Sequence, residues 1–149
     1  MRKDNVYLPH AIKLKIQAQA KEKYPFECCG ILFGKKVPDN GRKIDDYVRV
    51  QNECCFDDKN RHFRLDPLKL YEFEKRYREK GLDIFGFFHS HPDAPAVLSV
   101  EDEQEMIPGL LYMIAEVQNG DHGRIRAWEK DQPKGIAREL SIRIIMERQ

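Results

Sequence analysis

Two histidines one residue apart give the first indication of chemistry in this sequence. His89 and His91 follow the apolar run Ile84–Phe88, which is typical of a β-strand buried on both faces. Side chains at positions i and i+2 of a strand project from the same face, so the two imidazoles can share one metal ion. Zinc binds imidazole nitrogens at about 2.0–2.1 Å. The pair therefore predicts a zinc site at the end of a rigid strand.

A third ligand is expected from Asp102, one turn into a helix that is predicted to run from Ser99 to about Met106. The segment from Pro92 to Leu98 contains two prolines, and we expect it to form a loop that folds this helix back over the histidines. Three protein ligands with a water in the fourth position are typical of a catalytic zinc site rather than a structural one. Such a zinc lowers the pKa of its water and polarises a substrate carbonyl.

This chemistry also needs a general base and a donor for the developing oxyanion. Glu27 is the candidate base, because a carboxylate in the segment Pro25–Gly30, beside an apolar run, needs a reason to be there. Ser99 is the candidate oxyanion donor. A competing interpretation is that Ser99 and Asp102 form a capping box at the start of the helix, and the two interpretations are partly compatible.

The bulk composition favours a globular protein and disfavours two classes of partner. The 149 residues are 41% hydrophobic and 34% charged, and the formal net charge is +1. A nucleic-acid binder usually carries a basic stripe, and a membrane-anchored protein carries a long apolar run or a polybasic patch. We therefore expect no nucleic-acid partner, no membrane association and a cytoplasmic location.

The four cysteines form two adjacent pairs, Cys28-Cys29 and Cys54-Cys55. Neither pair has the C-x-x-C spacing of a zinc knuckle or a thioredoxin-like site. We expect free thiols, and Cys28 and Cys29 are interpreted as packing residues rather than nucleophiles.

Periodicity and turn signals predict a mixed α/β (α+β) fold in a single domain that spans residues 1–149, with a curved mixed β-sheet flanked by a helix on each side. The predicted helices start at Pro9, Asp66-Pro67 and Ser99; the first ends near Tyr24 and the second stops at Gly81. The predicted strands cover residues 29–34, 44–50, a short stretch around Phe63 and Leu65, 84–89, 111–117, 124–128 and 138–145. For the last of these, a helix is a competing interpretation.

The pattern of Glu27, His89-Ser90-His91-Pro92, Ser99 and Asp102 resembles the JAMM motif of the JAMM/MPN metalloproteases: a distant glutamate, H-x-H, seven residues, S, two residues, D. The segment Tyr24–Gly34 is also similar to the family's P-x-E-x-C-G-x-L-x-G segment. Asn52, Gly86 and Trp128 lie where prokaryotic members tend to place them, so the resemblance covers about residue 8 to residue 145. Leu98 departs from the proline that many members have before the motif serine, which affects the shape of the loop rather than the ligand set.

The resemblance implies an MPN/JAMM-like fold, one Zn²⁺ per chain held by His89, His91 and Asp102, Glu27 as general base and Ser99 as oxyanion stabiliser. It also implies hydrolysis of a peptide or isopeptide bond after the C-terminal Gly-Gly type tail of a ubiquitin-like or sulfur-carrier protein. Two alternatives stay open. The chain could be a non-catalytic MPN-type protein-binding module, or a zinc hydrolase of a small-molecule amide.

Overall fold

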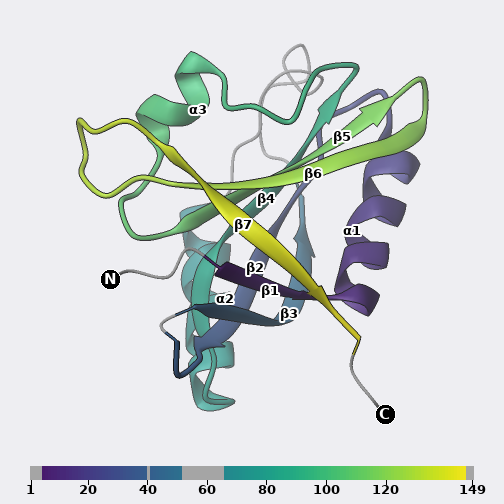
Figure 1. Cartoon of the computed structure of the whole chain (residues 1–149). Helices are drawn as coiled ribbons and strands as arrows, with labels where there is room; N and C mark the ends of the chain where they lie inside the picture. The colour runs from purple at the N-terminus through teal and green to yellow at the C-terminus, as the bar shows by residue number, and fades with distance from the viewer. Residues whose placement is uncertain (1–4, 40, 52–65, 147–149) are drawn as a thin grey trace.

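A β-sheet closed into a barrel dominates the computed structural model, which describes residues 5–39, 41–51 and 66–146 (Figure 1). In chain order the elements are β1 (Asn5–Pro9), α1 (His10–Lys23), β2 (Cys29–Lys36), β3 (Arg42–Val50), α2 (Pro67–Glu79), β4 (Asp83–Pro92), α3 (Val100–Glu105), β5 (Leu111–Gln118), β6 (Asp121–Glu129) and β7 (Arg138–Ile145). The short strand predicted around Phe63 and Leu65 lies outside the described residues, as do Asn52, Cys54 and Cys55.

The strands follow the order β1-β3-β2-β4-β5-β6-β7 around the barrel, and β7 pairs with β1 to close it. β1 is parallel to β3 and β7, and β4 is parallel to β5, whereas the remaining neighbours are antiparallel. The predicted mixed α/β fold with a curved sheet is thus confirmed. Closure depends on β1, which is missing from the predicted elements because its five residues are too few to show a periodic pattern.

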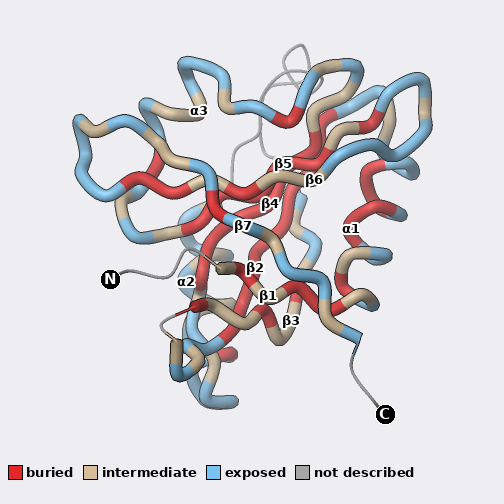
Figure 2. Tube along the Cα trace, in the orientation of Figure 1, coloured by how far each residue is buried: buried red, intermediate tan, exposed pale blue. Residues whose placement is uncertain are grey.

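Alternate residues along the strands face two separate apolar cores, as the strand repeat of two requires. The larger core contains Leu32, Phe88 and Met113 together with Ile12, Ile16 and Ala20 of α1. The second core contains the neighbouring residues Ile31, Phe87 and Tyr112 together with Tyr77 of α2. Figure 2 shows the buried residues following the central strands and the side of α1 that packs on them. The two long helices therefore stabilise the two faces of the sheet.

The ends of the elements follow from a few residues. α2 begins at Pro67, as predicted, and the N–H of Leu68 donates to the Asp66 carboxylate over 3.0 Å. α1 begins at His10, one residue later than predicted, because Pro9 is the last residue of β1. The C-terminal segment 138–145 is a strand rather than the competing helix, since it pairs with both β6 and β1.

β4 is the strand that carries the two histidines, and it lies between β2 and β5. Gly86 allows its close approach to β5, because a Cβ atom at this position would lie 1.8 Å from the carbonyl oxygen of Leu111. Strands on both sides thus hold β4 firmly. Among the described residues, no helix is long and apolar enough to span a membrane.

Candidate metal centre

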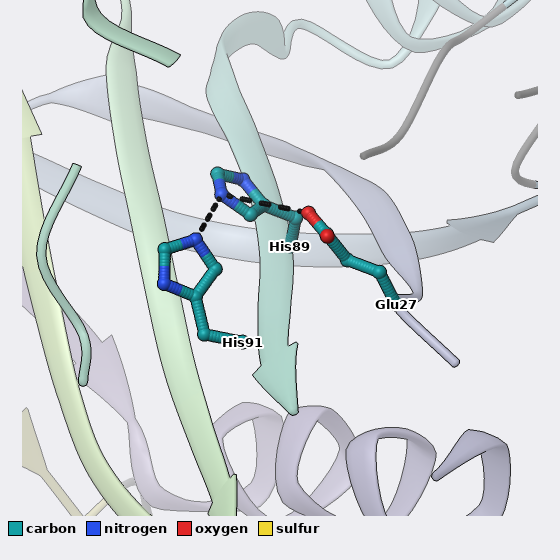
Figure 3. Close-up of side chains that lie close together, drawn as sticks. All are labelled: Glu27, His89 and His91. Atoms are coloured by element: carbon teal, nitrogen blue, oxygen red, sulfur yellow. Dashed lines mark hydrogen bonds and ion pairs between the residues drawn. The ribbon is translucent and has the colours of Figure 1, made fainter. Parts of the chain in front are cut away.

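His89 and His91 lie at the end of β4 with their side chains on the same face, as their i, i+2 spacing predicts. Their Nε2 atoms are 3.1 Å apart. His89 is fully buried, and its position on β4 is fixed by pairing with Cys29 of β2 and Ile114 of β5. Figure 3 shows the two imidazoles side by side at the end of the strand. The strand therefore presents two nitrogen donors at a rigid edge.

Asp102 extends from the first turn of α3 towards the same point. Its Oδ2 atom lies 3.4 Å from Nε2 of His89 and 3.3 Å from Nε2 of His91. Asp102 also forms a capping box with Ser99, since its N–H donates to Ser99 Oγ over 2.9 Å and its Oδ2 accepts from the Ser99 N–H over 3.1 Å. The cap and the approach to the histidines coexist in a single side-chain conformation.

The spacing of these three donors fits a tetrahedral zinc site. Zinc binds nitrogen and carboxylate oxygen at about 2.0–2.2 Å, so two ligands of a tetrahedral site lie about 3.3 Å apart. The three distances among His89, His91 and Asp102 range from 3.1 to 3.4 Å. Two imidazole nitrogens and one carboxylate oxygen are also a donor set that zinc accepts with one coordination position left open.

Glu27 approaches the same cluster from the segment between α1 and β2. The ligand atoms of Glu27, His89 and His91 lie within 4.8 Å of one another, and Glu27 Oε1 is 3.9 Å from His89 Nε2 (Figure 3). This is longer than the spacing of about 3.3 Å expected between two ligands of one tetrahedral zinc. The Glu27 side chain is almost fully buried, which is unusual for a carboxylate at a loop position. Glu27 Oε1 is farther from His89 Nε2 than Asp102 Oδ2 is, although it belongs to a group of three side chains that could hold a metal ion.

Burial and hydrogen bonding set the charge states of this cluster. Burial lowers the pKa of His89. Burial also lowers the pKa of His91 and raises that of Asp102, but hydrogen bonds reverse both: the net pKa of His91 is raised, and that of Asp102 is well below its usual range. Burial raises the pKa of Glu27 to about 8. Asp102 is therefore ionised at neutral pH, as a metal ligand must be.

The loop after β4 orients His91 through a contact that the sequence did not indicate. Nδ1 of His91 lies 2.8 Å from the carbonyl oxygen of Pro95. A carbonyl only accepts hydrogen bonds, so Nδ1 donates its proton and the lone pair of the neutral ring is at Nε2, towards Asp102 and His89. Metal-bound histidines commonly have such a partner on the other ring nitrogen.

The same loop is fastened at Ala96, which is fully buried. The Ala96 N–H donates to the carboxylate of Glu116 over 2.9 Å, and its carbonyl accepts from the indole N–H of Trp128 over 3.3 Å. The loop predicted between Pro92 and Leu98 is thus a fixed connection between β4 and α3. The sequence singled out Trp128 only because prokaryotic members of the family tend to have it at this place. Its hydrogen bond to the Ala96 carbonyl shows that it helps to hold the loop.

The cluster opens into a cleft of about 450 Å³. Its lining residues are Pro25, Glu27, His91, Pro92, Asp93, Ala94 and Ser99. Because Ser99 Oγ accepts its hydrogen bond from the Asp102 N–H, the Ser99 hydroxyl proton can be donated to an oxygen atom in the cleft. Three of the five candidate residues, Glu27, His91 and Ser99, thus line the cleft, and the other two lie directly behind them, His89 at 3.9 Å from Glu27 and Asp102 at 3.3 Å from His91.

Two comparisons with known protein sequences match most of the chain. A family model described as prokaryotic homologs of the JAB domain matches residues 9–131. A desampylase from Haloferax volcanii is 30% identical over 123 residues, which is 80% of this chain and 79% of that protein.

Two solution structures share the fold. A protein from Desulfitobacterium hafniense has a TM-score of 0.80 at 27% identity and covers 95% of this chain and 94% of its own. A protein from Salinibacter ruber has a TM-score of 0.69 at 27% identity and covers 91% of this chain and 89% of its own. The likeness extends over nearly the whole chain, including the strands and helices that carry the site.

Proposed function

The chain belongs to the family of prokaryotic JAB-domain proteins, and from this premise we propose that it is a zinc-dependent hydrolase. Its substrate is a peptide or isopeptide bond that follows the C-terminal tail of a ubiquitin-like or sulfur-carrier protein, and its place of action is the cytoplasm. The relative from Haloferax volcanii is an enzyme by its name, desampylase, which supports the assignment of this chain as a hydrolase. The observation that carries the proposal is the tetrahedral spacing of three donor atoms beside a buried carboxylate.

His89, His91 and Asp102 are the residues that would hold the metal, one ion per chain. Zinc in such a site would polarise the scissile carbonyl and lower the pKa of a coordinated water towards about 7. The contribution of the protein is a fixed set of donors. β4 holds the two imidazoles, the Pro95 carbonyl sets the tautomer of His91, and the cap of α3 holds the Asp102 carboxylate in place.

Glu27 is the general base and then the general acid of the reaction. In its ionised form it accepts a proton from the attacking water and then delivers it to the leaving amine nitrogen, so that the C–N bond breaks to give a carboxylic acid and a neutral amine. Burial alone raises the pKa of Glu27 to about 8, and a cation on the neighbouring donors would favour the ionised form. The Glu27 Oε1 atom lies 3.9 Å from His89 Nε2, so a reactant held by the three donors would lie within hydrogen-bonding reach of this carboxylate. Ser99 donates its hydroxyl proton to the oxyanion of the tetrahedral intermediate.

The cleft supports a small-residue tail as substrate. Pro25, Pro92 and Ala94 form its apolar walls next to Glu27 and His91. Glycine lacks a Cβ atom, so a Gly-Gly tail can bring its scissile carbonyl close to the donors without clashing with these walls. A volume of about 450 Å³ is also within the range of small-molecule sites, which keeps hydrolysis of a small amide as the second candidate.

Cleavage of a ubiquitin-like fusion tests the proposal. The probe is a ubiquitin-like protein that ends in Gly-Gly and is followed by a reporter domain, and the matched probe ends in Val-Val. We expect cleavage after Gly-Gly that a chelator abolishes and added zinc restores, with little cleavage of the Val-Val probe. Cleavage of small acyl amides with both fusions left intact would favour the second candidate. Zinc binding without any hydrolysis would favour a non-catalytic binding module.

A further inference from the structure

The segment that carries Glu27 is neither helical nor extended over its full length. α1 ends at Lys23 and β2 begins at Cys29, so the residues between them have no continuous ladder of backbone hydrogen bonds. A carboxylate that acts on a proton has to be held to within a fraction of an ångström. The position of Glu27 therefore depends on the contacts that fasten this short segment to the strand of the metal ligands.

Ser90, the residue between the two histidines, forms the first of these contacts. Ser90 is fully buried, and its side chain points away from the metal face. Its Oγ accepts a hydrogen bond from the N–H of Cys28 over 2.9 Å, and its own N–H donates to the Cys28 carbonyl over 3.0 Å. Both contacts are buried and lie one residue after Glu27. They fix the C-terminal end of the segment directly to β4.

Tyr24, three residues before Glu27, forms the second contact. Its hydroxyl donates to Oδ2 of Asp93 over 2.6 Å. Asp93 lies two residues after His91 and has a left-handed backbone with φ of +53°, which Asp tolerates better than most residues. Its other carboxylate oxygen accepts from the Asn119 N–H over 2.9 Å, and its N–H donates to the Val117 carbonyl over 2.8 Å. Asp93 is thus anchored to the β5–β6 hairpin.

We propose that Tyr24 and Ser90 are positioning residues that hold Glu27 against the metal-ligand strand, Tyr24 through the Asp93 carboxylate and Ser90 through the backbone of Cys28. The inference rests on the proposed function, since it assigns these residues to the placement of its general base. The two contacts reach β4 at Ser90 and the residue directly after β4 at Asp93, on either side of His91. The distance from Glu27 to the two histidines is therefore set by the strand that carries them. Neither residue is among those that line the cleft, and neither is a proposed metal ligand.

Single substitutions separate positioning from folding. Tyr24→Phe removes one hydroxyl, and Ser90→Ala removes one buried acceptor. The matched control is Tyr7→Phe, because Tyr7 makes the same kind of bond to Asp39 over 2.5 Å, near the end of β2 that lies away from Cys29 and His89. We expect kcat on the Gly-Gly fusion to fall about 10- to 100-fold in Tyr24→Phe and in Ser90→Ala, with KM and zinc content unchanged. Tyr7→Phe should keep the parent kcat.

Conservative variants at these contacts should preserve most of the activity. Asp93→Asn keeps a side-chain oxygen for Tyr24 and tolerates the left-handed backbone, and Ser90→Thr keeps the hydroxyl. Each should retain more activity than the variant that deletes the same contact. An equal fall in kcat for Tyr7→Phe would overturn the proposal, because it would reflect general destabilisation.

Hydrogen exchange gives a readout that does not depend on turnover. In Ser90→Ala the amide of Cys28 loses its acceptor, and we expect it to exchange at least about ten times faster than in the parent. Tyr24→Phe should speed exchange at Glu27 and Cys28 relative to Tyr7→Phe. Parent-like exchange in both variants overturns the positioning role, even if the parent is active. If the parent hydrolyses no fusion, the proposed function fails, and exchange alone decides the positioning role.

Discussion

The carboxylate of Asp102 accepts a hydrogen bond from the N–H of Ser99 through Oδ2, the same oxygen that faces both histidines. The capping interaction and the approach to the metal position are therefore parts of one arrangement. A capping box of this kind fixes a side chain at the third helical position, which reduces the freedom that a metal ligand would otherwise lose on binding. The short helix α3 serves the site by holding this one carboxylate.

Replacing Glu27 with glutamine should separate metal binding from hydrolysis. Glutamine has nearly the same shape but cannot take a proton, so we expect kcat to fall at least about 100-fold. Zinc content should stay at the parent level, because Glu27 lies beside the donor set rather than within it. Steady-state assays on the Gly-Gly fusion, with metal content measured on the same sample, check this. Turnover close to that of the parent would remove Glu27 from the mechanism.

Zinc should stabilise the fold. At a free zinc concentration about 100 times its dissociation constant, binding to the native state alone adds about 2.7 kcal/mol to the free energy of unfolding. For a chain of this size that corresponds to a rise in Tm of about 5–10 °C. His91→Ala removes one donor and should show a much smaller rise. Thermal unfolding of metal-free protein with and without added zinc gives the comparison, and equal shifts in both proteins would place the ion elsewhere.

The thiol of Cys28 should be inert in the native protein. Burial raises the pKa of Cys28 to about 11, so at pH 8 only about one molecule in a thousand carries the reactive thiolate. Because the native pKa lies above the unfolded value of about 8.5, the thiolate fraction rises with pH and approaches one half only near pH 11. Residue-level mass spectrometry after iodoacetamide treatment should show Cys28 labelled far more slowly in native protein than in urea. Rapid labelling at pH 8 would show that this cysteine is accessible.

Gly86 should be intolerant of any side chain. A Cβ atom there would lie 1.8 Å from the Leu111 carbonyl oxygen and 2.6 Å from its carbon, so β4 and β5 would have to separate. We expect Gly86→Ala to lower the free energy of unfolding by about 3 kcal/mol or more. Gly135→Ala is the control, because its nearest contact would be 3.2 Å, and its effect should be within about 1 kcal/mol. Urea titration of both variants measures the two free energies of unfolding. Similar midpoints for Gly86→Ala and Gly135→Ala would mean that β4 and β5 accommodate the added Cβ atom without loss of stability.

The sequence indicated which candidate residues lie close together, but it contained less information about the contacts that hold them. The strand repeat places His89 and His91 on one face and the capping pattern pairs Ser99 with Asp102, and the predicted loop between them brings the two pairs together. Glu27 was linked to them by its apolar surroundings and by the family resemblance. By contrast, the Pro95 carbonyl that orients His91, and the bond from Tyr24 to Asp93, arise from backbone conformation and distant pairing that no local pattern encodes.

The fold shows the same division. The buried run before His89 and the capping signal at Asp66 are local, and both elements appear where they were predicted. β1 pairs with β3 and β7, from opposite parts of the chain, and its five residues acquire strand structure through those partners. Closure of the barrel is therefore a tertiary result that the sequence pattern of Asn5–Pro9 could not predict.

The zinc content per chain distinguishes Asp102 from Glu27 as the third ligand. Elemental analysis would be made on protein purified without a chelator or a histidine tag, beside Asp102→Ala, Glu27→Gln and Ser99→Ala. Ser99→Ala removes the helix cap but no donor, so it controls for loss of the cap. We expect about one zinc per chain in the parent, in Glu27→Gln and in Ser99→Ala, and much less in Asp102→Ala. Equal zinc in the parent and Asp102→Ala, with loss in Glu27→Gln, would contradict this expectation and make Glu27 the third ligand.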